Sequence, residues 1–274
     1  RHINHIALYA LQQEARLQWQ LQHACLPADG ALRIRPVAVT TEFWREAHYP
    51  QPLHSAVRLL AAGADGLSLA AGLFEDGQAV GAQQAWLAAW GRQGVTAQPL
   101  PPAMVAALAP AVHGGVDLPA PQRPAGSGDL HRYPVQQPYA SRYGDLDADD
   151  CSSETAVMRG LEQARSALLK SAVALAGGEP ERDWAQWVVA RVELHFAAHR
   201  PPPALWTMAG AFAHIGRTSA VLRVALFDGQ ALQAVGDCVL VHTGSAAGPQ
   251  PVPDALRAAL TTLAWRADAA CPAI

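Results

Sequence analysis

The sequence carries little charge. Only 16% of its 274 residues are charged, and the formal net charge is -3 at pH 7 with His neutral. Binding to a phosphate backbone or to anionic lipid needs concentrated positive charge, and this sequence offers none. We therefore expect no nucleic-acid partner.

Cysteine is also sparse. The chain has four cysteines, far apart and without C-x-x-C spacing: Cys25, Cys151, Cys238 and Cys271. This pattern fits neither a disulfide scaffold nor a zinc ribbon. We expect a reducing compartment, the cytoplasm, and neither a bound metal nor a cofactor.

Long apolar runs are missing as well. No stretch reaches the roughly 18 consecutive apolar residues of a membrane span, because Ala-rich segments such as residues 59–73 are interrupted by Gly and Asp. We expect no membrane span. The first residues do not resemble a secretory signal, and position 1 is Arg rather than Met, so we expect the natural beginning to lie upstream.

Half of the residues are hydrophobic, and the chain repeats itself. Four short segments recur in order at a nearly constant offset of about 150 residues, which indicates two copies of one module. The matching ranges are 12–16 with 161–165, 47–52 with 198–203, 76–79 with 228–231, and 98–103 with 250–255. The sequence therefore predicts an N-terminal module (1–110), a Pro/Gly-rich linker (111–132) and a C-terminal module (133–274).

Each copy shows the same order of elements. In the second copy, residues 135–142 read as a strand, 152–176 as a long helix, and 187–197, 204–214, 219–227 and 231–242 as strands. The first copy has a helix at 3–24 and strands near 32–47, 53–62, 67–74 and 79–90. This pattern predicts an α+β fold in which each curved antiparallel sheet wraps around its own helix, and the two modules form a pseudo-dimer.

An acidic segment, residues 142–150, directly precedes the long helix of the second copy. The first turn of a helix has unsatisfied N–H groups, so acids there can be a cap, or the helix start can hold a developing oxyanion. A calcium loop is excluded because Asp150 stands where Gly is needed and Ala156 where Glu is needed.

These residues resemble a known family. Residues 142–147 (Arg-Tyr-Gly-Asp-Leu-Asp) and 162–165 (Glu-Gln-Ala-Arg) look like the signature of hot-dog-fold thioesterases of the 4-hydroxybenzoyl-CoA and acyl-ACP thioesterase type. That signature reads R-[WY]-x-D-x-D-x-x-x-H-[VI]-N-N, followed by a helix ending near E-x-A-R. The opening residues 2–5 with 14–16 are similar to its helix half, so the resemblance implies two fused hot-dog modules.

The resemblance also implies roles for particular residues. Asp147 falls on the catalytic acid, Asp149 on a position where acyl-ACP thioesterases carry Asn, and His2 and Asn4 on the His-x-Asn of the other copy. We expect a carboxylate to attack the thioester or to activate water, with helix N–H groups holding the oxyanion. The substrate-binding candidates are Asp145, Cys151 and Ser153 around the helix start and Arg217 for the phosphates of a CoA-like substrate.

Each copy departs from the family pattern. The second has Cys151 and Ser153 in place of His and Asn, and the acid expected four positions before His2 lies outside the sequence. Either the first copy is catalytic and the second degenerate, which we favour, or one composite pocket forms between them.

The expected activity is hydrolysis of acyl-CoA or acyl-ACP, by a chain that can form homo-oligomers. The alternatives are a hot-dog enoyl or hydroxyacyl thioester hydratase-dehydratase and a non-catalytic acyl-CoA-binding module.

Overall fold

A computed structural model of the chain describes residues 3–23, 32–91, 94–113, 120–180, 186–244 and 248–266. The chain folds into two compact units. The first comprises Arg1–Gln122 with Glu193–Arg200, and the second comprises Arg123–Val192 with Pro201–Ile274.

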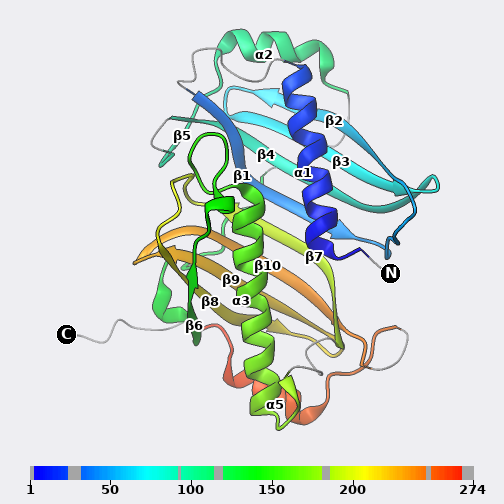
Figure 1. The fold of residues 1–274 in the computed structure, drawn as a ribbon, viewed down its shortest axis with the longest axis vertical. Helices are drawn as coiled ribbons and strands as arrows, with labels where there is room; N and C mark the ends of the chain where they lie inside the picture. Colours follow the sequence, from blue (N-terminus) through cyan, green and yellow to red (C-terminus); the bar gives the residue numbers. More distant parts are fainter. Residues whose placement is uncertain are drawn as a thin grey trace. The chain divides into compact units, whose positions relative to one another are not determined.

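The first unit is one helix against an antiparallel sheet. Its strands follow the order β2-β3-β4-β1, with the short β5 paired to β4. Helix α1 lies across one face of β2, β3 and β4 (Figure 1). The elements are α1 (His5–Gln22), β1 (Leu32–Phe43), β2 (Leu53–Gly63), β3 (Gly66–Glu75), β4 (Gln78–Gly91), β5 (Ala97–Gln98), α2 (Pro102–Leu108) and the 3-10 turn η1 (Ala109–Ala111).

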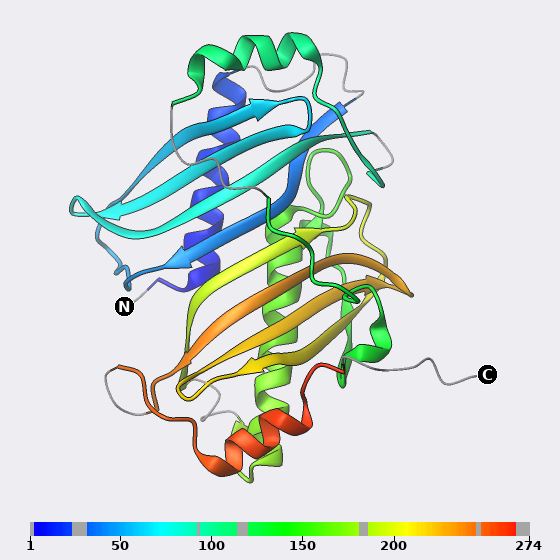
Figure 2. The same cartoon turned by 180° about the vertical axis from the view of Figure 1, so that it is seen from behind.

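The second unit repeats this design. Helix α3 packs on β8, β9, β10 and β6, and the strand order is β7-β10-β9-β8-β6, where the residues of β7 from Glu193 on are grouped with the first unit. From behind, the strands of each unit lie in front of its helix (Figure 2). The elements are η2 (Leu130–Arg132), β6 (Val135–Ala140), η3 (Tyr143–Asp145), α3 (Glu154–Leu175), β7 (Trp187–Phe196), β8 (Leu205–Ile215), β9 (Ser219–Asp228), β10 (Ala231–His242) and α5 (Asp254–Thr262).

Details of the backbone repeat as well. In the first unit Val112, which follows α2 and η1, forms a parallel bridge with Leu59 of β2. In the second unit Ala264, which follows α5, forms a parallel bridge with Phe212 of β8. The strands β2 and β8 have a register shift directly after Leu59 and Phe212. These shared irregularities support the internal duplication that the sequence predicts.

The sheet-facing side of each helix is buried at equivalent positions. In α3 these include Val157, Met158, Leu161, Arg165 and Leu169, all below 9% exposed. At the repeat-related positions α1 buries Leu8, Tyr9, Gln12, Arg16 and Gln20. Each unit therefore has its own seam between helix and sheet. On the helix side, the seam of the second unit is apolar apart from Arg165, and the seam of the first unit is largely polar.

The predicted elements agree closely with the structure. Both long helices and all nine longer strands are present, and each sheet has its helix on one face, as predicted. Helices α2 and α5 were not predicted, although residues 98–103 and 250–255, which include the first residues of these helices, were matched to each other.

Candidate active site

Asp145 fixes the loop between β6 and α3 through hydrogen bonds with Arg142 and Ser153. Its side chain is buried, and Oδ2 accepts a hydrogen bond from the Arg142 N–H at 2.8 Å. Its backbone carbonyl accepts one from the Ser153 N–H, also at 2.8 Å. An isolated bridge between Leu146 and Ser152 closes the same loop. Asp145 thus holds the acidic segment against the start of α3.

Asp147 lies at the tip of this loop and is half-buried. Its Oδ1 accepts hydrogen bonds from the N–H groups of Asp149 (2.9 Å) and Cys151 (3.1 Å). The Asp147 N–H donates back to the Cys151 carbonyl at 2.9 Å. Asp150 completes the turn with φ of 60°, a left-handed conformation that Asp tolerates better than most residues. The position of the Asp147 carboxylate is therefore fixed by the backbone around it.

Helix α3 begins directly after this turn. Ser153 is its N-cap, and Ser153 Oγ accepts from the Ala156 N–H at 3.1 Å. Because the start of a helix is its positive end, the Asp147 turn lies in a region that favours negative charge. Cys151 is buried beneath the turn, whereas the side chain of Asp149 is exposed. Five predicted site residues are thus gathered in one loop: Asp145, Asp147, Asp149, Cys151 and Ser153.

The space beside the loop is small. A cavity of about 10 Å³ is lined by Asp145 and Ser152 of this loop and by Tyr139 and Trp206, among others. This volume is at the lower limit for one water molecule. The cavity as it stands cannot hold an acyl chain.

Arg217 lies away from this loop. It is exposed and follows the last residue of β8, Ile215, whereas Trp206 at the start of β8 lines the cavity beside Asp145. Nine residues of extended strand span about 30 Å. The structure does not bring Arg217 together with the acidic loop.

One of the two predicted residues of the first copy, Asn4, lies at the start of α1. Asn4 is exposed and caps this helix, with Oδ1 accepting from the Ala7 N–H at 2.9 Å. This cap is the counterpart of Ser153 on α3. His2 lies outside the described residues.

Neither a protein-family model nor a curated protein matches the sequence at a significant level. Solved structures do match the fold. A 12:0-ACP thioesterase from Umbellularia californica has a TM-score of 0.70 at 12% identity, over 91% of this chain and 92% of that chain. An acyl-ACP thioesterase from Bacteroides thetaiotaomicron has a TM-score of 0.64 at 9% identity, over 87% and 90%. A protein described as an oleoyl thioesterase from Lactobacillus plantarum has a TM-score of 0.68 at 12% identity, over 89% and 88%.

The chain has a double hot-dog fold. Each unit is one hot-dog module, a long helix with a curved antiparallel sheet around it. The expected fold class is confirmed over nearly the whole chain.

The second hot-dog module contains a buried cation that the sequence analysis did not single out. Arg165 of α3 is 5% exposed, and its Nε donates to Glu162 Oε2 at 2.7 Å. Burial opposes the charge, but the contact with Glu162 outweighs it and raises the pKa of Arg165. Burial also raises the pKa of the nearby Cys238 thiol to about 12. The signals in the sequence were the E-x-A-R motif, which ends at Arg165, and the recurrence of Arg at the equivalent position 16.

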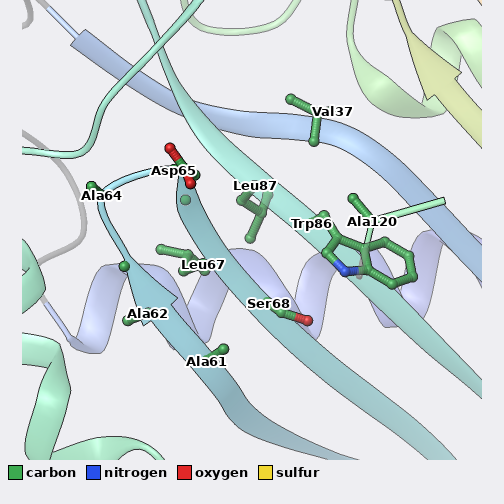
Figure 3. Close-up of a pocket in the computed structure, with 12 residues that line it drawn as sticks. Val37, Ala61, Ala62, Ala64, Asp65, Leu67, Ser68, Trp86, Leu87 and Ala120 are labelled. Carbon is green, nitrogen blue, oxygen red and sulfur yellow. The ribbon is translucent and has the colours of Figure 1, made fainter. Parts of the chain in front are cut away.

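The first hot-dog module has a larger hollow, of about 430 Å³, around the turn between β2 and β3 (Figure 3). The indole of Trp86 and the side chains of Val37 and Ser68 line it, together with small residues of the turn. Ser68 Oγ accepts from Gln84 Nε2 at 2.9 Å. The hollow is mainly apolar and contains no residue of the predicted site.

His48 and His199 occupy equivalent positions in the two matched ranges 47–52 and 198–203. His48 is exposed, whereas His199 is buried with its Nε2 2.8 Å from the Pro36 carbonyl oxygen. Among the described residues no group of three or more His, Cys, Asp and Glu could hold a metal ion. No helix in the described part of the chain is long and apolar enough to cross a membrane.

Proposed function

We propose that the chain hydrolyses acyl thioesters of CoA or acyl carrier protein. Two of the solved structures with this double hot-dog fold are acyl-ACP thioesterases, and the match extends over about nine-tenths of both chains. The acidic loop at the start of α3 supplies groups suited to this reaction. Fold similarity alone is an analogy, so the proposal depends on the loop.

The observation that carries the proposal is the geometry of Asp147. Two backbone N–H groups hold its Oδ1 at the positive end of a 22-residue helix. Hydrogen bonds to a carboxylate favour its charged form. A charged carboxylate in a fixed position, next to helix N–H groups, can act on a carbonyl carbon while those groups stabilise the oxygen.

The reaction is proposed as follows. Asp147 accepts a proton from a water molecule as the water oxygen bonds to the thioester carbonyl carbon, and the carbonyl oxygen takes up the electron pair. Collapse of this intermediate breaks the carbon–sulfur bond. The proton returns from Asp147 to the leaving sulfur, so the products are a carboxylic acid and a thiol. In the covalent variant the Asp147 carboxylate attacks the carbonyl carbon, the carbon–sulfur bond breaks and a thiolate leaves, which gives a mixed anhydride. Water then cleaves the anhydride to the carboxylic acid and the Asp147 carboxylate, and the released proton goes to the thiolate.

The test is an assay of thiol release from acyl-CoA and acyl-ACP of several chain lengths by the full chain. Asp147→Asn keeps the oxygen that accepts from Asp149 and Cys151 but removes the charge. We expect it to lower kcat/KM at least 100-fold, since general acid–base catalysis contributes about 10²–10⁴-fold. Asp150→Asn is the matched control, because it changes an exposed acid three residues away and Asn also tolerates the left-handed conformation.

The outcomes separate the possible sites. Full activity after Asp147→Asn would exclude Asp147, the acid of the second module, from catalysis. His2→Ala then tests the first copy, since loss of activity in that variant alone places the reaction there. No thiol release from any substrate by the unaltered chain would contradict the proposed function itself.

A non-catalytic acyl-binding role is the second candidate. It is favoured by Cys151 and Ser153, which stand where the family carries His and Asn. It predicts that acyl-CoA raises the melting temperature of the chain without release of thiol.

A further inference from the structure

The seam between α1 and the first sheet is polar at its centre. Three side chains on this side of α1 are almost fully buried: Gln12 at 1%, Arg16 at 1% and Gln20 at 2% exposed. Arg16 Nε donates to Gln83 Oε1 of β4 at 2.6 Å, and Gln83 Nε2 donates to Thr41 Oγ1 of β1 at 3.0 Å. A line of hydrogen bonds thus occupies the position where a helix and a sheet usually share an apolar core.

Two oxygens in this seam are buried without a hydrogen-bond partner among the described residues. They are Gln12 Oε1 and Gln20 Oε1. The orientation of the Gln12 amide is set by its neighbour, because Gln12 Nε2 donates to the Ala71 carbonyl and the opposite orientation would place two acceptors together. Such unpaired groups favour exposure to water, so they favour separation of α1 from the sheet.

The second hot-dog module provides an internal reference. The repeat relates Gln12 to Leu161, Arg16 to Arg165 and Gln20 to Leu169. Leu161 is 2% and Leu169 is 1% exposed, so the same positions are equally buried but apolar. The buried Arg is common to both helices, whereas at the other two positions α1 has unpaired glutamines and α3 has leucines.

We propose that α1 is a movable cover of the first sheet, which detaches from β2, β3 and β4 while the rest of the chain stays folded. The polar seam gives α1 less apolar burial than α3, and detachment hydrates the unpaired oxygens of Gln12 and Gln20. The opening uncovers the strip that contains Thr41, Ala71 and Gln83. This conformational device is independent of the proposed hydrolase activity.

Amide hydrogen exchange of the full chain, followed by mass spectrometry, tests the proposal. In the unaltered chain we expect the central amides of α1 to exchange at least tenfold faster than those of α3. The double variant Gln12→Leu/Gln20→Leu gives α1 the residues of α3 at both positions. We expect it to slow exchange in α1 at least tenfold and to leave α3 unchanged.

Gln18→Leu is the matched control. It makes the same chemical change in α1, but Gln18 is exposed and its Nε2 donates to Glu14 Oε1 on the same helix. We expect α1 exchange to stay within twofold of the unaltered chain. Equal protection of α1 and α3 in the unaltered chain would overturn the proposal. So would a folded Gln12→Leu/Gln20→Leu chain whose α1 exchanges like that of Gln18→Leu.

Discussion

Two acids two residues apart in the same loop have different tasks. Asp145 is buried and bonds to the Arg142 N–H, so its carboxylate holds the loop closed. Asp147 is half-buried and sits at the tip of the loop, near the helix start. The sequence motif contains both acids but does not distinguish them. Only the burial and the hydrogen bonds indicate which one can reach a substrate.

Gly66 and Gly77 lie in the two hairpin turns of the first module and allow a matched prediction. Both have positive φ, 146° and 75°. A Cβ on Gly66 would overlap the Leu87 carbonyl oxygen, whereas a Cβ on Gly77 would meet nothing within 4 Å. We expect Gly77→Ala to lower the free energy of unfolding by about 1–2 kcal/mol and Gly66→Ala to lower it by clearly more. Urea unfolding of the two variants measures this, and equal losses would contradict the clash.

The Cys238 thiol is expected to be unreactive in the folded chain. Burial raises its pKa to about 12 from an ordinary value of 9.0, so almost no thiolate exists at pH 8. The unfolded chain ionises this thiol above pH 9.0, so its contribution to stability is full below that pH and is lost as the pH rises toward 12. Labelling with a thiol reagent at pH 8, with mass spectrometry of the Cys238 peptide, should succeed only after urea is added.

At the scale of elements, the start of α3 depends on a single cap. Ser153 Oγ satisfies the Ala156 N–H, and Ser153 also joins the helix to the loop through its own N–H. We expect Ser153→Ala to lower the free energy of unfolding by about 1 kcal/mol. Ser153→Asp keeps an oxygen acceptor and should retain most of that stability. A thermal-melting series of the two variants compares them, and an equal loss for both would argue against the cap.

The elements themselves were largely predictable from the sequence. Apolar spacing predicted a helix at 152–176, and α3 covers Glu154–Leu175. Strand patterns ended at turns such as Asp76-Gly77, where both residues adopt positive φ. Helices α2 and α5 were missed because they are only 7 and 9 residues long and start at prolines or just after them, and such short helices are marginal on their own.

The polar seam of the first module was not predictable in the same way. Gln12, Arg16 and Gln20 follow a helical spacing, but polar residues at such positions normally mark a solvent-facing side. Their burial becomes visible only when Gln83 and Thr41 of the sheet are placed opposite them. The repeat held a clue, since Leu161 and Leu169 occupy the related positions of α3.

At the scale of the whole molecule, the chain should unfold in two steps. It consists of two compact units, and the first has the polar seam with unpaired buried oxygens. Multi-unit chains often depart from two-state unfolding. We expect β3 and β4 to lose hydrogen-exchange protection at lower urea concentration than β8 and β9. A single coincident transition for all four strands would contradict this prediction.

The double hot-dog architecture was predictable from the whole sequence because the duplication is spread over four separated segments. The site was predictable only in part. The motif placed five candidate residues in one loop because they are close in sequence, and the structure has them there: Asp145, Asp147, Asp149, Cys151 and Ser153. It could not place Arg217, because that position depends on the length and direction of β8.

The parallel bridges that follow the short helices have a consequence for self-association. Strand β2 has only one strand neighbour in its sheet, and unpaired edges of this kind recruit strands from other molecules. The bridge of Val112 to Leu59, with the His113 N–H bonded to the Leu59 carbonyl, occupies part of that edge. The segment after α2 therefore covers part of the edge of β2, and we expect protease cleavage between α2 and Val112 to uncover this edge and to promote aggregation.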